Sequence, residues 1–221
     1  MPDRLQRNCE ALAKVPEATI HRLPIYLSRL KALRARGVAQ VSSRELAEPM
    51  NIKPGQLRHD FHYFGNFSRP GRPYEVEILI NRLSEIMCLG NPTPYIIAGA
   101  GLLGQAIANY SRFEEDGFLL RGIFDINPRI LGMTVNDLPI RHLEEMSSFL
   151  ADEGIQIGAI AVPPSAAQDI CDQMLNGGVL GIWNFAPVDL KVADGVVLQD
   201  EFLSVGLMAL NYKVKAGMRQ A

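Results

Sequence analysis

A glycine pattern in the middle of the chain constrains its fold more than any other feature. It reads G-x-G-x-x-G from Gly99 to Gly104, directly after the apolar residues 95–98 and before apolar residues at helical spacing. A tight glycine turn between a buried strand and a helix is typical of the first unit of a parallel α/β sheet. Residues 119–124 predict the second strand, which ends at Asp125. We therefore expect a Rossmann-like parallel sheet.

The glycine pattern also predicts a phosphate-binding loop. Gly99 would permit the tight turn, Gly101 would let the backbone approach a pyrophosphate, and Gly104 would let the helix pack on the strand. Free N–H groups at the helix N-terminus would bind the phosphates. Asp125 lies 21 positions beyond Gly104, where a carboxylate can bind both ribose hydroxyls and repel a 2′-phosphate, so NAD(H) is favoured over NADP(H). The alternative is a glycine turn that binds no ligand.

The sequence after Asp125 continues the alternation of strands and helices. Residues 157–162 and 180–183 are apolar runs of strand length, and residues 165–175 between them have helical spacing. This alternation indicates parallel β-α units. Residues 202–214 are apolar at helical spacing and have little chain left to cover them. We expect this last helix to pack against a partner subunit.

Charge is divided unevenly along the 221 residues. Residues 1–72 contain 13 Lys and Arg against 6 Asp and Glu, a net charge of +7, whereas the remainder contains 9 against 18, a net charge of −9. This asymmetry indicates a polyanionic partner for the first part only. With 48% hydrophobic residues, no signal peptide and no apolar segment of membrane length, we expect a cytoplasmic globular protein. Cys9, Cys88 and Cys171 have neither disulfide nor zinc spacing.

The basic first part predicts three helices and a wing. The first helix, residues 18–36, has an apolar face formed by Ile20, Leu23, Leu27, Leu30 and Leu33. Ser42 and Glu45 form a capping box for a short second helix, which stops near Asn51. Pro54 suits the first turn of a third helix that runs to Gly65. Residues 66–73 are turn-rich and basic, as a short hairpin wing would be, and residues 76–87 form a linking helix.

The third helix is a candidate recognition helix for the DNA major groove. Arg58 can make a bidentate bond to guanine, and His59 stands beside it, while Leu57, Phe61 and Phe64 belong to the core. The same stretch could be an ordinary surface helix, because helix-turn-helix geometry also occurs in proteins that do not bind DNA. The net charge of +7 on residues 1–72 favours the DNA-binding interpretation.

Taken together, these residues resemble the Rex family of redox-sensing repressors. The stretches that carry the resemblance are residues 22–27, 41–47, 57–67, 99–104, 124–128, 161–163 and 184–188. Within them, the string from Arg58 to Gly65, R-x-D-F-x-Y-F-G, is the most specific. The resemblance covers residues 18–214 and implies a homodimer with swapped C-terminal helices, which binds an inverted-repeat operator and is released when NADH replaces NAD+.

The expected α/β organisation is a tail (1–17), a winged helix-turn-helix domain (18–88), a Rossmann-like NAD(H)-binding domain (89–200), and a swapped dimerisation helix with its tail (201–221). Candidate cofactor-binding residues are Gly99, Ala100, Gly101, Leu102, Leu103, Gly104, Tyr110, Asp125, Pro163, Asn184 and Phe202. Candidate residues for double-stranded operator DNA are Ser42, Ser43, Arg44, Gln56, Arg58, His59, Tyr63, Arg69 and Arg72. We expect no catalytic residue and no metal site.

Several positions depart from the family pattern, Ser28 and Phe202 most seriously, and other function classes stay open. The family tends to carry Arg where this chain has Ser28 and Asp where it has Phe202, and these groups help to link cofactor state to the DNA-binding domain. The alternatives are an NAD-dependent oxidoreductase, a CoA-binding ligase-like subunit, and a cofactor-binding scaffold without DNA affinity. Against an oxidoreductase, His142 is the only His after residue 72, and no Lys lies between Lys53 and Lys191.

Overall fold

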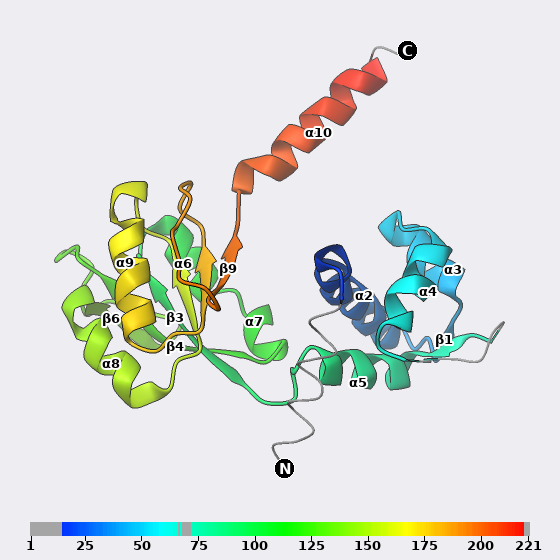
Figure 1. The fold of residues 1–221 in the computed structure, drawn as a ribbon, viewed down its shortest axis with the longest axis horizontal. Helices are drawn as coiled ribbons and strands as arrows, with labels where there is room; N and C mark the ends of the chain where they lie inside the picture. Colours follow the sequence, from blue (N-terminus) through cyan, green and yellow to red (C-terminus); the bar gives the residue numbers. More distant parts are fainter. Residues whose placement is uncertain (1–14, 66, 68–71, 219–221) are drawn as a thin grey trace. The chain divides into compact units, whose positions relative to one another are not determined.

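The chain folds as two compact units, which divide between Gly90 and Asn91 (Figure 1). The computed structural model describes residues 15–65, 67 and 72–218. Part of the expected wing, including Arg69, and most of the expected N-terminal tail lie outside the described residues. None of the described helices is long and apolar enough to cross a membrane.

The N-terminal unit is a small helical bundle with a two-stranded ribbon. Its elements are α2 (Glu17–Ala35), β1 (Gln40–Val41), α3 (Ser43–Ala47), η1 (Glu48–Met50), α4 (Pro54–His62), β2 (Tyr74–Glu75) and α5 (Val76–Ile86). The two short strands pair antiparallel, with Gln40 opposite Glu75. The core joins α2, α3, α4 and α5 through residues such as Leu30, Leu46, Leu57 and Leu83, each completely buried. The segment 76–87, predicted to be a linking helix, forms α5 and packs into the core of this unit.

Local sequence signals explain where these helices begin and end. The Ser42 hydroxyl accepts the Glu45 N–H at 3.2 Å, and Glu45 Oε2 accepts the Ser42 N–H at 2.8 Å, which confirms the predicted capping box. Asn51 adopts a left-handed conformation with φ 55°, and Pro54 opens α4. The expectation that Ile20 faces the core is wrong: it is exposed, whereas Tyr26 is completely buried.

The C-terminal unit is built on a seven-stranded sheet. Its strands are β3 (Thr93–Ala98), β4 (Phe118–Asp125), β5 (Thr134–Val135), β6 (Leu138–His142), β7 (Ile157–Ile160), β8 (Gly181–Asn184) and β9 (Val197–Asp200). They lie in the order β5-β6-β4-β3-β7-β8-β9, and every pairing except β5 with β6 is parallel. This confirms the predicted Rossmann-like parallel sheet.

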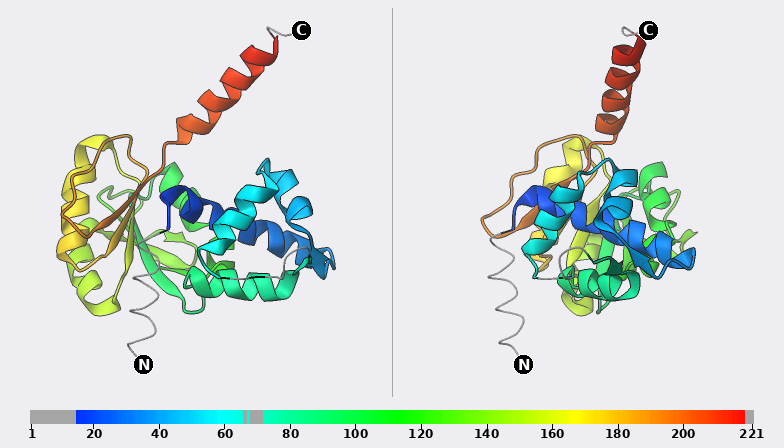
Figure 2. Two further views of the ribbon diagram at one scale, coloured as in Figure 1. Left: turned by 45° about the vertical axis from the view of Figure 1, so that its right-hand side comes forward. Right: turned by 90° about the vertical axis from the view of Figure 1, so that its right-hand side faces the viewer.

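Helices cover the two faces of this sheet (Figures 1 and 2). These helices are α6 (Leu102–Ala108), α7 (Arg112–Glu115), α8 (Met146–Glu153) and α9 (Pro164–Asn176), with the short turn η2 (Leu143–Glu145). The last helix, α10 (Leu203–Met218), extends away from the sheet. Ile96 and Ala98 of β3 face the core shared with α8 and α9, whereas Tyr95 and Ile97 face the core that contains α6. Successive strand residues point to opposite faces, so one strand serves both layers.

Several elements were absent from the sequence interpretation. The β5–β6 hairpin turns at Asn136 and Asp137, which both have positive φ values, 47° and 60°. This turn chemistry is typical of tight hairpins. Helix α8 and strand β9 were also missed, and β9 has alternating exposed and half-buried positions rather than a continuous apolar run.

Candidate cofactor and DNA sites

The glycine loop lies at the point where the strand order of the sheet reverses. From β3 the chain first adds β4 and β6 on one side, and later β7, β8 and β9 on the other. In open α/β sheets, ligands bind outside the carboxyl ends of the strands at this switch point. Gly99 follows β3 there with φ +99°, and a Cβ on it would lie 2.4 Å from the carbonyl oxygen of Ala161 after β7. Only glycine fits this position.

The other two glycines have opposite surroundings, as the sequence predicts. A Cβ on Gly104 would lie 1.8 Å from the Gly99 carbonyl oxygen, so this glycine lets α6 pack against the end of β3. A Cβ on Gly101 would have no atom within 4 Å. The backbone at Gly101 therefore borders open space at the start of α6, where a pyrophosphate fits against the helix N-terminus.

Asp125 ends β4 beside this loop. Its Oδ2 accepts the Ala100 N–H at 2.7 Å, and its Oδ1 accepts the Asn127 N–H at 2.8 Å. The carboxylate therefore connects the glycine loop to the turn after β4. His142 occupies the neighbouring position on β6, in register with Asp125. His142 ends this strand and is half-buried.

The remaining candidate cofactor residues are dispersed over the C-terminal unit. Leu102 is 93% exposed at the start of α6, and Leu103 packs partly against the sheet core. Pro163 is exposed and precedes α9. Tyr110 lies beyond the C-terminus of α6, at the opposite end of this helix from the glycine loop. Phe202, between β9 and α10, is 47% exposed.

Asn184 differs from these residues because its side chain is turned into the fold. It is 1% exposed; its Nδ2 donates to Asp200 Oδ1 and to the Val188 carbonyl, and its Oδ1 accepts the Ala186 N–H. These bonds hold the end of β8 against β9. Any contact of Asn184 with a cofactor would therefore involve its backbone.

An apolar cavity of about 320 Å³ opens on the sheet face beside β8 and β9. Its lining includes Tyr95, Phe113, Trp183 and Val197. The rings of Phe113 and Trp183 meet edge to face, with centroids 5.5 Å apart. This cavity could not be predicted from the sequence, because its aromatic residues come from four separate elements.

Helix α10 carries an exposed apolar surface. Its exposed apolar side chains are Leu203, Val205, Leu207, Met208, Leu210, Tyr212 and Val214. The helix extends away from the sheet of its own unit (Figures 1 and 2). Apolar residues on all sides of a helix are typical of one that is covered in an assembly.

In the N-terminal unit, α3 and α4 form the helix-turn-helix. Leu57 and Phe61 of α4 are buried, as predicted, while Arg58 and His59 are exposed. Arg58 Nη1 donates to the Ser43 Oγ at 3.0 Å, so the two candidate DNA contacts come from different helices and meet. The rings of His59 and Tyr63 lie 5.3 Å apart. These four side chains form one group across the helix-turn-helix, in which Ser43 is half-buried and the other three are exposed.

The other candidate DNA contacts have more varied positions. Ser42 caps α3 with its hydroxyl, and Arg44 pairs with Glu48 at 3.1 Å. Arg72 is exposed two residues before β2, and Arg69 lies outside the described residues. Gln56 is exposed on the first turn of α4, and its amide nitrogen donates to Asp60.

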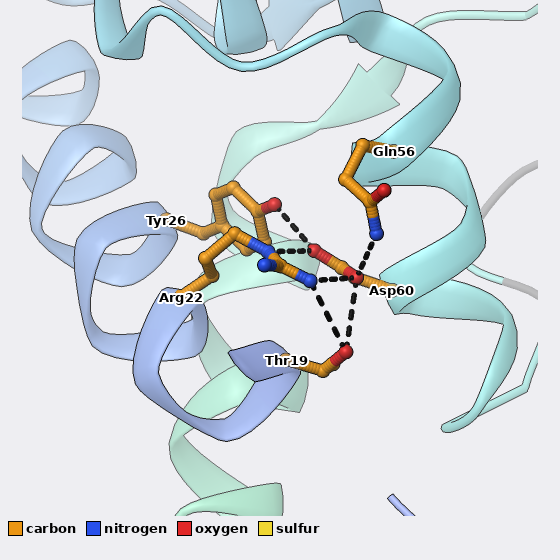
Figure 3. A network of polar contacts seen from close by, with 5 residues as sticks. All are labelled: Thr19, Arg22, Tyr26, Gln56 and Asp60. Carbon is orange, nitrogen blue, oxygen red and sulfur yellow. Dashed lines mark hydrogen bonds and ion pairs between the residues drawn. The ribbon is translucent and has the colours of Figure 1, made fainter. Parts of the chain in front are cut away.

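Asp60 is the central residue of a buried polar network that sequence reasoning did not identify (Figure 3). It is completely buried on α4, and Arg22 of α2 donates to both of its oxygens, from Nε over 2.6 Å and from Nη2 over 2.7 Å. The Tyr26 hydroxyl donates over 2.6 Å and the Thr19 hydroxyl over 3.1 Å. The spacing of Asp60 with Leu57, Phe61 and Phe64 on one helix face was the available signal for a buried, partnered carboxylate.

This network keeps Asp60 ionised. Burial opposes the charged form, but the hydrogen bonds from its four partners outweigh burial and lower the pKa of Asp60 to about 2. Burial, together with the bond to Asp60, raises the pKa of Tyr26 well above its usual range. The ion pair therefore connects α2 firmly to the candidate recognition helix.

Comparisons with known proteins agree with both halves of this description. A family model described as a putative DNA-binding protein N-terminus matches residues 14–62, and one described as a CoA binding domain matches residues 91–188. The redox-sensing transcriptional repressor Rex of Clostridium novyi (strain NT) is 43% identical over 203 residues, which cover 92% of this chain and 97% of that protein.

Two solved structures of RSP, a Rex-family repressor, are similar over most of their length. RSP in complex with β-NADH has a TM-score of 0.86 and 41% identity, covering 93% of this chain and 96% of RSP. RSP in complex with β-NAD+ and operator DNA has a TM-score of 0.85 and 43% identity, covering 92% of this chain and 94% of RSP. The chain belongs to the Rex family of redox-sensing transcriptional repressors.

Proposed function

We propose that this protein is a cytoplasmic transcriptional repressor that binds operator DNA as a homodimer and changes its DNA affinity with the balance of NADH and NAD+. The observation that carries the proposal is that one continuous similarity spans both units, and that the similar protein RSP was solved with β-NAD+ and operator DNA together. The exposed group around Arg58 supplies the DNA contacts, and the open backbone at Gly101 supplies the dinucleotide site.

The proposal assigns NAD(H) to the glycine loop on the basis of the local fit. Gly101 leaves room for the pyrophosphate, and Asp125 places a carboxylate beside the loop for the ribose hydroxyls. Because a carboxylate repels a 2′-phosphate, NADP(H) is the poorer ligand. The bound dinucleotide acts as a signal and not as a hydride donor in catalysis. His142 lies on β6, which pairs with β4. Strands β7 and β8 lie on the other side of β3.

The dimer in this proposal forms through α10. Its exposed apolar side chains need a cover, and a second copy presents both an identical helix and the apolar cavity beside Trp183. An exchanged C-terminal helix would bring Phe202 near the cofactor site of the partner.

The test is a titration of the full-length protein on a duplex selected from random DNA, with saturating NADH and with saturating NAD+ at one salt concentration. Sequence-specific binding that is weaker with NADH supports the proposal. The absence of any sequence preference in both conditions contradicts it. The salt concentration stays fixed because phosphate contacts alone change DNA affinity strongly with salt.

A second candidate ligand follows from the match of residues 91–188 to a CoA binding domain. CoA also carries a pyrophosphate, which the same glycine loop could hold. Calorimetry with NADH, NAD+ and CoA separates the two ligands. Binding of CoA in preference to both dinucleotides would favour this second candidate, with the DNA-binding unit then responding to CoA.

A further inference from the structure

Gln56 has an amide whose orientation is fixed by its neighbour. It lies one helical turn before Asp60 on α4, and its Nε2 donates to Asp60 Oδ1 over 2.8 Å. An ionised carboxylate can only accept hydrogen bonds, so the nitrogen of the amide must face Asp60. Figure 3 shows this arrangement, in which Oε1 points away from the carboxylate. Gln56 is exposed on the turn of α4 that precedes Arg58.

Asp60 cannot turn to follow Gln56, because other donors hold both of its oxygens. Arg22 binds Oδ1 and Oδ2 in a bidentate pair, Tyr26 binds Oδ2, and Thr19 binds Oδ1. All three donors belong to α2. Charge-assisted bidentate pairs of this kind are geometrically specific. The network therefore provides a rigid anchor below an exposed amide.

Resting on the function proposed above, we propose that Asp60 is a positioning residue that fixes the Gln56 amide to read one adenine in the major groove. A glutamine recognises adenine by accepting from N6–H with Oε1 and donating to N7 with one N–H. The amide nitrogen has two hydrogens. The hydrogen trans to Oε1 bonds to Asp60, which leaves the hydrogen beside Oε1 and the oxygen itself for the base.

The fixed orientation explains why adenine fits better than the other bases. The outward oxygen needs a donor, which only adenine N6 and cytosine N4 provide in the major groove, and only adenine carries an acceptor, N7, beside that donor on the same base. An unanchored amide could rotate by 180° about its last bond and offer the nitrogen where the oxygen was. The anchor removes this second orientation and so sharpens the preference.

The test measures affinity for a selected operator and for its single-base-pair variants, using the full-length protein. Gln56→Met keeps the length of the side chain and removes the amide. We expect its preference for adenine over the other bases to fall by about tenfold, at one operator position only. Asp60→Asn should weaken the preference at that same position. The matched control is Gln40→Met, the same change at an exposed glutamine of β1 outside the Asp60 network, which should leave the preference unchanged.

A measurement on the wild-type protein keeps the inference testable if Asp60→Asn does not fold. Nitrogen relaxation should show an ordered Gln56 side-chain amide, whereas the exposed Gln40 of β1 should have a mobile one. A mobile Gln56 amide, or unchanged base preferences in Gln56→Met, would overturn the inference while leaving the repressor function intact. Wild-type protein without any base preference would instead contradict the proposed function.

Discussion

The Asp125 carboxylate accepts the Ala100 N–H at 2.7 Å, which ties the end of β4 to the second residue of the glycine loop. One oxygen therefore organises the loop backbone, and the other accepts the Asn127 N–H. A carboxylate has about four lone-pair sites, so both oxygens can still accept ribose hydroxyls. Asp125 thus shapes the glycine loop, and in the proposed function it also contacts the dinucleotide.

This double role predicts that Asp125→Ala weakens NADH binding more than loss of one ribose contact would. Hydrogen bonds to charged groups contribute roughly 1.5–3 kcal/mol each, so we expect NADH affinity to fall by at least about tenfold. Discrimination against NADPH should fall as well, since the repelling charge is gone. Calorimetry with both cofactors measures the two effects. The matched control is Asp137→Asn at the exposed β5–β6 turn, which should change neither.

The glycines of the loop predict a separation between binding and stability. Gly101→Val places a side chain in open space, so the melting temperature should stay close to that of the wild type while NADH binding is lost. Gly104→Ala brings a Cβ within 1.8 Å of the Gly99 carbonyl, so it should destabilise the protein by roughly 1–3 kcal/mol. Thermal unfolding and NADH calorimetry on both variants check this. Tight NADH binding by Gly101→Val would show that the pyrophosphate lies elsewhere.

Sequence patterns predicted the glycine loop because each glycine there has a separate local cause. Gly99 has a positive φ, Gly104 packs closely against the Gly99 carbonyl, and the backbone of Gly101 borders open space. All three glycines lie within six residues. The capping box of Ser42 and the helix start at Pro54 are equally local. Such features depend on neighbours in the sequence and can be predicted without the fold.

Features that depend on distant residues were not predictable in the same way. Asp60 and Arg22 are 38 positions apart, so their ion pair depends on how α2 packs against α4. The aromatic cavity beside Trp183 needs the register of β7, β8 and β9 before its lining residues meet. Asn184 was expected to face a cofactor, yet its amide bonds to Asp200, which lies 16 positions away.

Arg58 should be essential for sequence-specific DNA binding. Arg58→Ala removes the exposed guanidinium that meets Ser43, and a bidentate contact with guanine is worth roughly 1–3 kcal/mol of discrimination. The expected result is a loss of preference at one guanine, with NADH affinity unchanged. Arg82→Ala is the control, because Arg82 pairs with Glu85 on α5 outside the helix-turn-helix. Unchanged operator affinity in Arg58→Ala would rule out α4 as the recognition helix.

The lowered pKa of Asp60 predicts that part of the free energy of unfolding is lost at acidic pH. The pKa of Asp60 is lowered from 3.8 to about 2. A lowered carboxyl pKa stabilises the fold above the unfolded value near pH 4, and this contribution is lost as the pH falls through about 2. Asp60→Asn should be less stable than the wild type at pH 7, and the difference should shrink by roughly 2 kcal/mol between pH 5 and pH 2. Urea unfolding at several pH values measures it; a constant difference would contradict the ionised state of Asp60.

The last prediction concerns how strongly NADH changes operator affinity. A ligand shifts a DNA-binding equilibrium only through its different affinities for the two arrangements of the dimer. The family resemblance implies that an Arg and an Asp supply part of this difference, at positions where this chain has Ser28 and Phe202. Neither residue can form an ion pair. Glu201, one position before Phe202, accepts the Trp183 Nε1–H at 3.2 Å, so its carboxylate already has a partner on β8.

We therefore expect NADH to lower operator affinity by less than about tenfold, or roughly 1.4 kcal/mol of coupling free energy. The measurement is an operator titration with saturating NADH and with saturating NAD+ at the same salt concentration. The double variant Ser28→Arg with Phe202→Asp restores the charges, and its coupling should exceed that of the wild type. Each single variant introduces one charge without its partner and serves as the control. A hundredfold loss of operator affinity with NADH in the wild type would contradict this expectation. It would show that contacts other than those at Ser28 and Phe202 couple NADH binding to DNA binding.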